Sequence, residues 1–241
     1  MRKYVFAGGT AIVTGAASGI GEALAHGLAA RGSHLVLLDR DAERLAGVAT
    51  AIRERYPPAA VDSVGVDTVV IDSVGVDTVV VDTVVVDLAD QDATAQAGRQ
   101  LAASHPQTTL LINNAGVAMG GRFDQLTLEE FEWVVDINFR AVVTLTHHLL
   151  PVLRSHPGAH LANLSSIYGI IAPPGQTAYS ASKFAVRGFT EALRAELAAD
   201  GVGVTCVHPG GIATRIATTA RWGPASPSRT RPAGGPWPTG C

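Results

Sequence analysis

Two side chains four residues apart, Tyr179 and Lys183, offer the chemistry of proton transfer. A free tyrosine has a pKa of about 10, which is too high for a proton shuttle at neutral pH. An ammonium group nearby lowers that pKa, and residues four apart on a helix lie on one face. A hydroxyl at Ser166, thirteen residues earlier, can hydrogen-bond a substrate carbonyl and orient it. Taken singly, a Tyr-x-x-x-Lys pair is more often a solvated pair on a helix surface.

A glycine-rich segment near the N-terminus has the composition of a phosphate-binding loop. Residues 14–21 read TGAASGIG and lie between an expected strand and an expected helix. In such a loop Gly15 allows a tight turn, Gly19 lets backbone approach a pyrophosphate, and Gly21 allows close packing of helix on strand. The free N–H groups at the start of the helix then attract phosphate. The segment therefore predicts a dinucleotide site.

Asp39 lies eighteen residues after Gly21, at the end of the second expected strand. A carboxylate there accepts a hydrogen bond from a ribose 2′-OH and repels a 2′-phosphate, which predicts NAD as the cofactor and makes NADP the less favoured one. Arg40 argues the other way, because a guanidinium can accept that phosphate. The alternative interpretation of Asp39 is a cap on the strand end.

These residues need a scaffold that brings them together, and the hydrophobic pattern predicts one. Short apolar runs predict strands, and amphipathic segments between them predict helices. Continuous apolar strands that alternate with helices indicate a parallel sheet covered on both faces, which is a doubly wound, Rossmann-type α/β fold in a single domain. The expected strands are 10–14, 34–38, 81–86, 110–112, 160–164 and 202–207, and the expected helices are 19–31, 41–56, 128–153 and 178–199.

Residues 61–90 form a tandem repeat in which Asp recurs every five residues. Five matches neither the strand period nor the helix period, so the aspartates cannot share one face, and a solenoid would need more stacked units. Three copies of VDTVV, at 66–70, 76–80 and 81–85, compete for one position in the sheet. Since the last copy alone leads into Leu88 and a helix, we predict a strand at 81–86 and an insertion at 61–80.

The composition excludes several classes of protein. A hydrophobic content of 47% with 16% charged residues excludes a wholly disordered chain. A net charge of −3 gives no reason to expect nucleic acid as a partner, and no apolar stretch is long enough to predict a membrane span. Two cysteines, Cys206 and Cys241, exclude a disulfide scaffold and a zinc site of paired cysteines, so no metal is expected. With no targeting signal recognised, we expect a cytoplasmic protein.

Together the motifs resemble the short-chain dehydrogenase/reductase family from about residue 10 to about residue 216. The resemblance rests on the order and spacing of the loop 14–21, Asp39, Asp87-Leu88, Asn113-Asn114-Ala115-Gly116, Asn138, Ser166, Tyr179, Lys183 and Pro209-Gly210. It implies an enzyme that transfers a hydride between a nicotinamide cofactor and a small-molecule alcohol or ketone, with the protein positioning the reacting atoms.

The resemblance also implies a role for each matching position. Tyr179 is implied to be the general acid/base, Lys183 its pKa tuner and a ligand of the nicotinamide ribose, and Ser166 the hydroxyl that orients the carbonyl. Asn138 is implied to hold a water in the proton relay, although by itself it also reads as a polar residue that kinks a helix. The implied cofactor-binding residues are Gly15, Ser18, Gly19, Ile20, Gly21, Asp39, Arg40, Asp87, Leu88, Asn114, Ala115, Gly116, Tyr179, Lys183, Pro209, Gly210, Ile212 and Thr214.

The C-terminal part departs from the family pattern. After Ile216 the family continues through a substrate-covering lid, another helix and a last parallel strand, whereas residues 221–241 are rich in Pro, Gly, Arg and Ser without periodicity. We therefore predict a catalytic domain at 1–220, a missing last strand and a disordered tail at 221–241. Our hypothesis is aberrant translation of a truncated gene, and the alternative is a natural disordered tail.

The resemblance further implies a homodimer through helices 128–153 and 178–199, while a tetramer is doubtful without the last strand. Two functions are compatible with the sequence. The first is hydride transfer between NAD(H) and a secondary alcohol or ketone. The alternative is a nucleotide-binding protein whose cofactor half, residues 10–120, is intact but whose turnover is impaired or absent because the substrate lid is lost.

Overall fold

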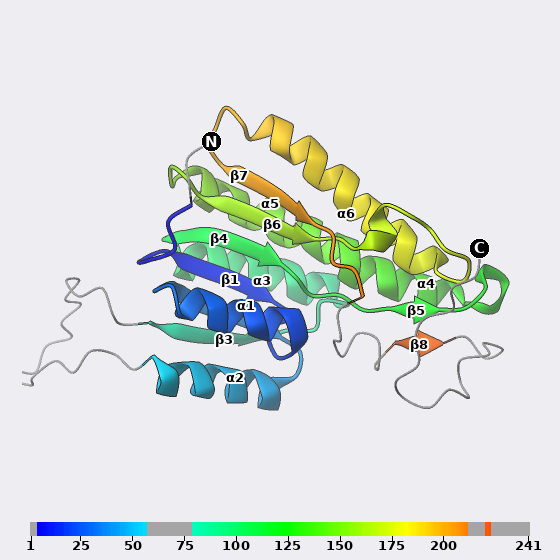
Figure 1. Ribbon diagram of the computed structural model, residues 1–241, viewed down its shortest axis with the longest axis horizontal. Helices are drawn as coiled ribbons and strands as arrows, with labels where there is room; N and C mark the ends of the chain where they lie inside the picture. Colours follow the sequence, from blue (N-terminus) through cyan, green and yellow to red (C-terminus); the bar gives the residue numbers. More distant parts are fainter. Residues whose placement is uncertain (1–3, 57–78, 212–219, 223–241) are drawn as a thin grey trace, which may run out of the picture.

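Six short apolar segments form one sheet in which every pairing is parallel (Figure 1). The computed structural model describes residues 4–56, 79–211 and 220–222. The strands run in the order β3-β2-β1-β4-β6-β7, so the order reverses between β1 and β4. Their bounds are β1 Thr10–Thr14, β2 His34–Asp39, β3 Val81–Val85, β4 Thr108–Asn113, β6 His160–Leu164 and β7 Gly203–Val207. The prediction of a single doubly wound domain is therefore confirmed.

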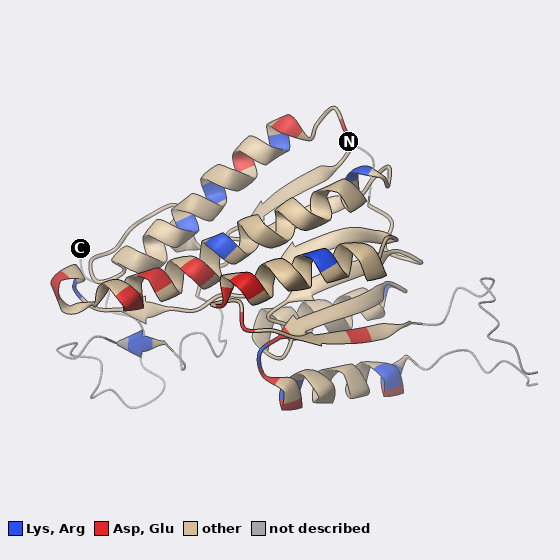
Figure 2. Ribbon diagram, turned by 180° about the vertical axis from the view of Figure 1, so that it is seen from behind, with Lys and Arg blue, Asp and Glu red and all other residues tan. Residues whose placement is uncertain are grey.

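Helices cover both faces of the sheet because successive strand residues point to opposite sides. Val13 packs in one apolar cluster with Leu28 of α1 and Ile52 of α2, whereas its neighbour Ile12 packs in another with Leu145 of α5. Charged residues lie mostly on the helices, and the strands are nearly free of them (Figure 2). The helices are α1 Gly19–Ala29, α2 Ala42–Arg55, α3 Gln91–Ser104, α4 Leu128–Val135, α5 Ala141–Arg154 and α6 Thr177–Glu196.

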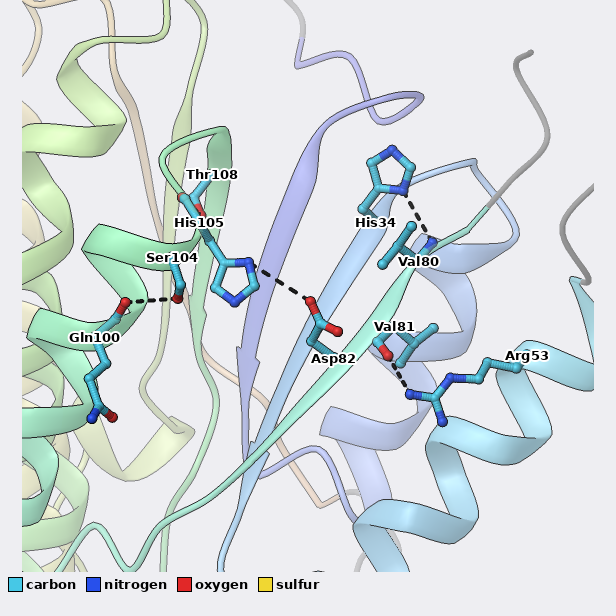
Figure 3. A network of polar contacts seen from close by, with 9 residues as sticks. All are labelled: His34, Arg53, Val80, Val81, Asp82, Gln100, Ser104, His105 and Thr108. Atoms are coloured by element: carbon cyan, nitrogen blue, oxygen red, sulfur yellow. Dashed lines mark hydrogen bonds and ion pairs between the residues drawn. The ribbon is translucent and has the colours of Figure 1, made fainter. Parts of the chain in front are cut away.

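Strand β3 is the last copy of the repeat, the one expected from the sequence. Its start is held by polar contacts (Figure 3): Arg53 donates to the carbonyl of Val81, and the Val80 N–H donates to His34 Nδ1 over 3.2 Å. After the strand, Leu88 is buried and the Asp90 side chain caps α3 by accepting from Ala93 N at 2.9 Å. Most of the expected insertion, residues 61–78, lies outside the described residues.

The expected helix 128–153 is present but contains a π turn. Between α4 and α5 the chain forms the π-helical segment Asp136–Arg140, which carries the buried Asn138. A π turn widens the helix by one residue per turn, and such turns are frequent at functional sites. The kink that we considered for Asn138 is thus a widened turn, which the apolar periodicity did not indicate.

A second, two-stranded sheet was not predicted. Strand β5 (Met119–Gly120) pairs in parallel with β8 (Arg221–Trp222), and the Arg221 guanidinium lies 4.0 Å from the centroid of the Trp133 ring. The prediction that residues 221–241 hold no packed element is therefore wrong at Arg221 and Trp222. Their partners lie about a hundred residues earlier in the chain, so local periodicity carried no signal. Residues 223–241 lie outside the described residues. The prediction of a missing last strand concerns the chain after Ile216, and most of that part also lies outside them.

Candidate active site

A cleft opens at the carboxyl ends of the strands, where the strand order reverses between β1 and β4. This is the position at which open parallel α/β sheets bind ligands. Gly21 and Asn138 are not among its lining residues, and Ile212 and Thr214 lie outside the described residues. The other predicted site residues all line it: Gly15, Ser18, Gly19, Ile20, Asp39, Arg40, Asp87, Leu88, Asn114, Ala115, Gly116, Ser166, Tyr179, Lys183, Pro209 and Gly210.

The glycine-rich loop has the backbone that its sequence predicts. Gly15 and Gly19 have φ of +66° and +60°, the left-handed region that favours glycine. A Cβ at Gly21 would lie 2.0 Å from the carbonyl oxygen of Gly15, so the first turn of α1 can approach the loop only without a side chain. Gly21 therefore serves packing, as expected, and Ser18, Gly19 and Ile20 face the cleft at the N-terminus of α1. This cradle fits the pyrophosphate of a dinucleotide.

Asn114 holds the loop from the neighbouring strand. Its Nδ2 donates to the carbonyl oxygens of Thr14 at 2.9 Å and Gly15 at 3.2 Å. In return, Thr14 Oγ1 accepts from the backbone N–H groups of Asn114 and Ala115, both at 3.0 Å. These four contacts tie the end of β1 to the end of β4. The Asn114 side chain thus shapes the cleft by fixing backbone.

Asp39 acts as a backbone cap and also faces the cleft. One carboxylate oxygen accepts from Ala17 N and the other from Asp41 N, each at 3.0 Å. A carboxylate has about four acceptor positions, so two remain for a ribose hydroxyl. Arg40 and Arg44 also line the cleft, and Arg44 pairs with Asp41 at 3.1 Å. The two interpretations of Asp39 made from the sequence are therefore compatible.

Tyr179, Lys183 and Ser166 come together at one end of the cleft. Tyr179 and Lys183 lie on the first two turns of α6, with Lys183 Nζ 5.8 Å from the centroid of the Tyr179 ring. Lys183 is 3% exposed and donates to the carbonyl oxygen of Leu164 at 2.9 Å. Ser166 lies two residues after the end of β6 and caps the 3₁₀ turn Ile167–Gly169, where its Oγ accepts from Tyr168 N at 3.1 Å.

Burial opposes charge on both members of the Tyr–Lys pair. Desolvation raises the pKa of Tyr179 above its ordinary value, and a hydrogen bond with Ser166 offsets part of that rise. Desolvation lowers the pKa of Lys183 to about 8. The lowering of the Tyr179 pKa that we expected from the sequence is therefore wrong for this structure, because the loss of solvent around the phenol dominates.

Asn138 clamps the loop after β4 against α6. Its Oδ1 accepts from Val117 N at 2.8 Å, and its Nδ2 donates to Val117 O and to Ser182 Oγ, both at 3.0 Å. A Cβ on Gly116 would lie 3.2 Å from Asn138 Oδ1 and 3.3 Å from Lys183 Nζ. The Asn138 side chain thus holds the backbone that passes beside Lys183. The supporting residues Val117 and Ser182 were not found from the sequence.

A buried polar chain beneath the site was also missed. Asn113 Nδ2 donates to Asn163 Oδ1 at 2.8 Å, and Asn163 Nδ2 donates to Thr190 Oγ1 at 3.0 Å. The chain connects β4, β6 and α6, which carry the reactive cluster. Polar residues inside the apolar strands that end at Asn113 and Leu164 were the available signal, because buried polar groups need partners.

Among the described residues there is neither a helix suited to cross a membrane nor a cluster suited to bind a metal ion. None of their helices is both long and apolar enough to cross a membrane. Over the same ranges, no three His, Cys, Asp or Glu side chains gather in a way that could hold a metal ion.

Comparison with known proteins decides the family. A family model described as short chain dehydrogenase matches residues 9–80 and 69–223. The chain belongs to the short-chain dehydrogenase family. SadH of Mycobacterium tuberculosis is 38% identical over 218 residues, which cover 89% of this chain and 71% of SadH. The expected family is confirmed, and this dehydrogenase is an NAD(P)-dependent oxidoreductase.

Solved structures of the family agree on the fold of this dehydrogenase and differ in cofactor. A short-chain dehydrogenase/reductase from Burkholderia phymatum, in complex with NAD, is 28% identical with a TM-score of 0.76, covering 96% of this chain and 73% of that one. A short-chain dehydrogenase from Sphingobium yanoikuyae, in complex with NADPH, is 29% identical with a TM-score of 0.74, covering 86% and 73%. A nicotinamide cofactor is therefore supported, while similarity does not choose between NAD and NADP.

Proposed function

We propose that this dehydrogenase transfers a hydride between NAD(H) and the carbon of a secondary alcohol or ketone, with Tyr179 as the general acid/base. One observation carries the proposal. The Tyr179 phenol, the Ser166 hydroxyl and the buried Lys183 ammonium lie together at one end of a cleft whose other residues include the glycine-rich loop. The cleft residues would hold a dinucleotide, and these three groups would supply the proton transfer that accompanies its hydride transfer.

In the direction of ketone reduction, the phenol of Tyr179 gives its proton to the substrate oxygen, and the Ser166 hydroxyl donates a hydrogen bond to the same oxygen. Ser166 Oγ accepts from Tyr168 N, and its own proton is donated to Tyr179 until a substrate oxygen takes that place. A bound nicotinamide cofactor would supply the hydride that ketone reduction needs. Lys183 stabilises the phenolate that remains on Tyr179, since an ammonium nearby favours the charged form. Alcohol oxidation runs through the same steps in reverse.

We also propose a preference for NAD over NADP. The support is the Asp39 carboxylate, which faces the cleft and keeps two acceptor positions after capping Ala17 and Asp41. A fixed carboxylate repels a 2′-phosphate, although Arg40 and Arg44 reduce that repulsion. On this proposal Asp39→Ala lowers the ratio of NAD to NADP affinity by about tenfold, the size of one charge-assisted hydrogen bond of ~1.5 kcal/mol. An unchanged ratio contradicts the preference.

The alternative of a nucleotide-binding protein without turnover is not favoured, because the family and its relatives are oxidoreductases. The homodimer through helices 128–153 and 178–199, the cytoplasmic location, the domain bounds with their tail, and the individual roles of the site residues stay predictions.

A two-step experiment tests the proposed function. Thermal shift of the purified chain with NAD and with NADP measures binding, and turnover is then followed at 340 nm on secondary alcohols and ketones. We expect NAD to raise the melting temperature, and Tyr179→Phe to keep that rise while turnover falls at least a thousandfold. Tyr56→Phe, at the end of α2 and away from the cleft lining, is the matched control and retains turnover. Turnover that survives Tyr179→Phe overturns the proposed role.

A further inference from the structure

A second tyrosine lies directly beside Tyr179. The ring centroids of Tyr168 and Tyr179 are 6.1 Å apart, and their planes make an angle of 82°. This is the edge-to-face arrangement that aromatic pairs favour. The backbone N–H of Tyr168 also donates to Ser166 Oγ at 3.1 Å. Tyr168 thus contacts both hydroxyl-bearing residues that act on the substrate oxygen in the proposed function.

Tyr168 lies just outside the cleft. Ser166 and Tyr179 are among its lining residues, whereas Tyr168 is not, although its side chain is only half-buried. A substrate whose oxygen reaches Tyr179 and Ser166 must extend away from the cofactor. The exposed part of Tyr168 is therefore available to whatever group the reacting carbon carries on that side.

The segment around Tyr168 is uncharged and exposes apolar side chains. Residues 165–182 contain no Asp, Glu, Lys or Arg. Ile167, Ile170 and Ile171 are 39%, 45% and 54% exposed, although large apolar side chains are usually covered. The next charged residue in sequence, Lys183, is buried and donates to Leu164 O. Within this segment no cationic side chain is available to a carboxylate or phosphate on a substrate, while an apolar group finds several neighbours.

We propose that Tyr168 is a specificity-determining residue, which contacts the substituent on the reacting carbon and selects uncharged alcohols and ketones that carry a bulky apolar, above all aromatic, group. This inference rests on the proposed function, because it assumes that the substrate oxygen binds at Tyr179 and Ser166. An aromatic contact adds enough free energy beyond simple burial to change a rate ratio about tenfold.

The test compares a bulky and a small substrate in two variants. For 1-phenylethanol, we expect Tyr168→Ala to lower kcat/KM about tenfold, while that for 2-butanol changes less than twofold. Tyr168→Phe keeps the ring and therefore keeps both values. The donor to Ser166 is backbone, so Tyr168→Ala retains that hydrogen bond. Tyr56→Ala removes a half-buried tyrosine away from the cleft lining and controls for a general loss of stability. Equal losses on both substrates, or none on either, overturn the inference.

Ligand binding separates this inference from the proposed function. The affinity of the chain with saturating NADH is measured for acetophenone and for 2-butanone by isothermal titration. Selective binding of acetophenone that Tyr168→Ala abolishes, with no turnover of any substrate, overturns the proposed function and supports the inference. If the chain turns over substrates but Tyr168→Ala leaves the ratio of the two kcat/KM values unchanged, the proposed function is supported and the inference is overturned. A chain with NADH that binds neither ketone overturns the inference.

Discussion

Lys183 gives the sharpest test of the energetics, because its burial has a consequence for stability that depends on pH. Its pKa falls from 10.5 to about 8 in the folded chain. Since one pKa unit corresponds to about 1.4 kcal/mol, folding with this ammonium buried costs about 3 kcal/mol at pH 7. Replacing Lys183 by Met keeps the length and apolar stem of the side chain and removes the charge. The cost should disappear in that variant.

The direction is set by proton linkage. Between about pH 8 and pH 10.5 the unfolded chain still holds the lysine proton and the folded chain has released it, so wild-type stability rises with pH across this window. Below pH 8 both states are protonated and the full cost remains. Above pH 10.5 both are neutral and the cost is gone. We expect the wild-type free energy of unfolding, relative to Lys183→Met, to increase by about 3 kcal/mol from pH 7 to pH 10.5.

Urea unfolding of the cofactor-free proteins at half-unit pH steps, followed by circular dichroism, measures this difference. Lost hydrogen bonding to Leu164 O shifts the Met variant by a constant amount, so it does not affect the slope. Tyr179→Phe is the matched control: it removes the neighbouring phenol and should keep the wild-type slope from pH 8 to about pH 9, below the ordinary tyrosine pKa of about 10. A difference between wild type and Lys183→Met that stays flat from pH 7 to pH 10.5 refutes the reasoning.

Three further predictions concern the scaffold. Gly21→Ala places a Cβ 2.0 Å from Gly15 O and should weaken NADH binding at least tenfold in a fluorescence titration; wild-type affinity would contradict this. Asn138→Ala leaves the half-buried N–H and C=O groups of Val117 without a side-chain partner and should cost about 1–3 kcal/mol in urea unfolding, whereas Ser155→Ala on the surface should cost far less. Deletion of residues 61–78 should leave the melting temperature and NADH affinity unchanged, since β3 keeps its contacts; a large loss of either would show that the repeat supports the fold.

Local sequence patterns predicted the sheet because each strand is apolar over its own length. The six strands, and their alternation with helices along the chain, can each be predicted from residues that are neighbours in the sequence. The glycine loop was predictable for the same reason, because the turn and the close backbone contact that require Gly15 and Gly21 both lie within the eight residues 14–21. Strand β3 could be chosen among three copies because it alone leads directly into the buried Leu88 and the Asp90 cap.

Features made by distant contacts were not predictable in this way. Strand β8 is stabilised by its pairing with β5 and by the contact of the Arg221 guanidinium with the Trp133 ring. Neither contact produces a periodic pattern in the sequence. The direction of the Tyr179 pKa shift was missed because spacing reveals the neighbouring charge and not the loss of solvent. The clamp from Asn138 to Val117 was missed because its partners are backbone groups, which every residue offers equally.

The site residues divide into two groups by what their polar atoms already contact. Asn114 and Asn138 bind backbone with their side chains, and Asp39 uses half of its acceptor positions in the same way. Ser166 and Tyr179 line the cleft and are the residues proposed to act on the substrate oxygen. Substitution in the first group should therefore reduce stability and cofactor affinity together. Substitution in the second should reduce turnover while the melting temperature and the cofactor affinity hold. That division rests on the hydrogen bonds alone, so a variant such as Asn114→Ala that lost turnover but kept both stability and NADH affinity would show that Asn114 meets the reactants directly.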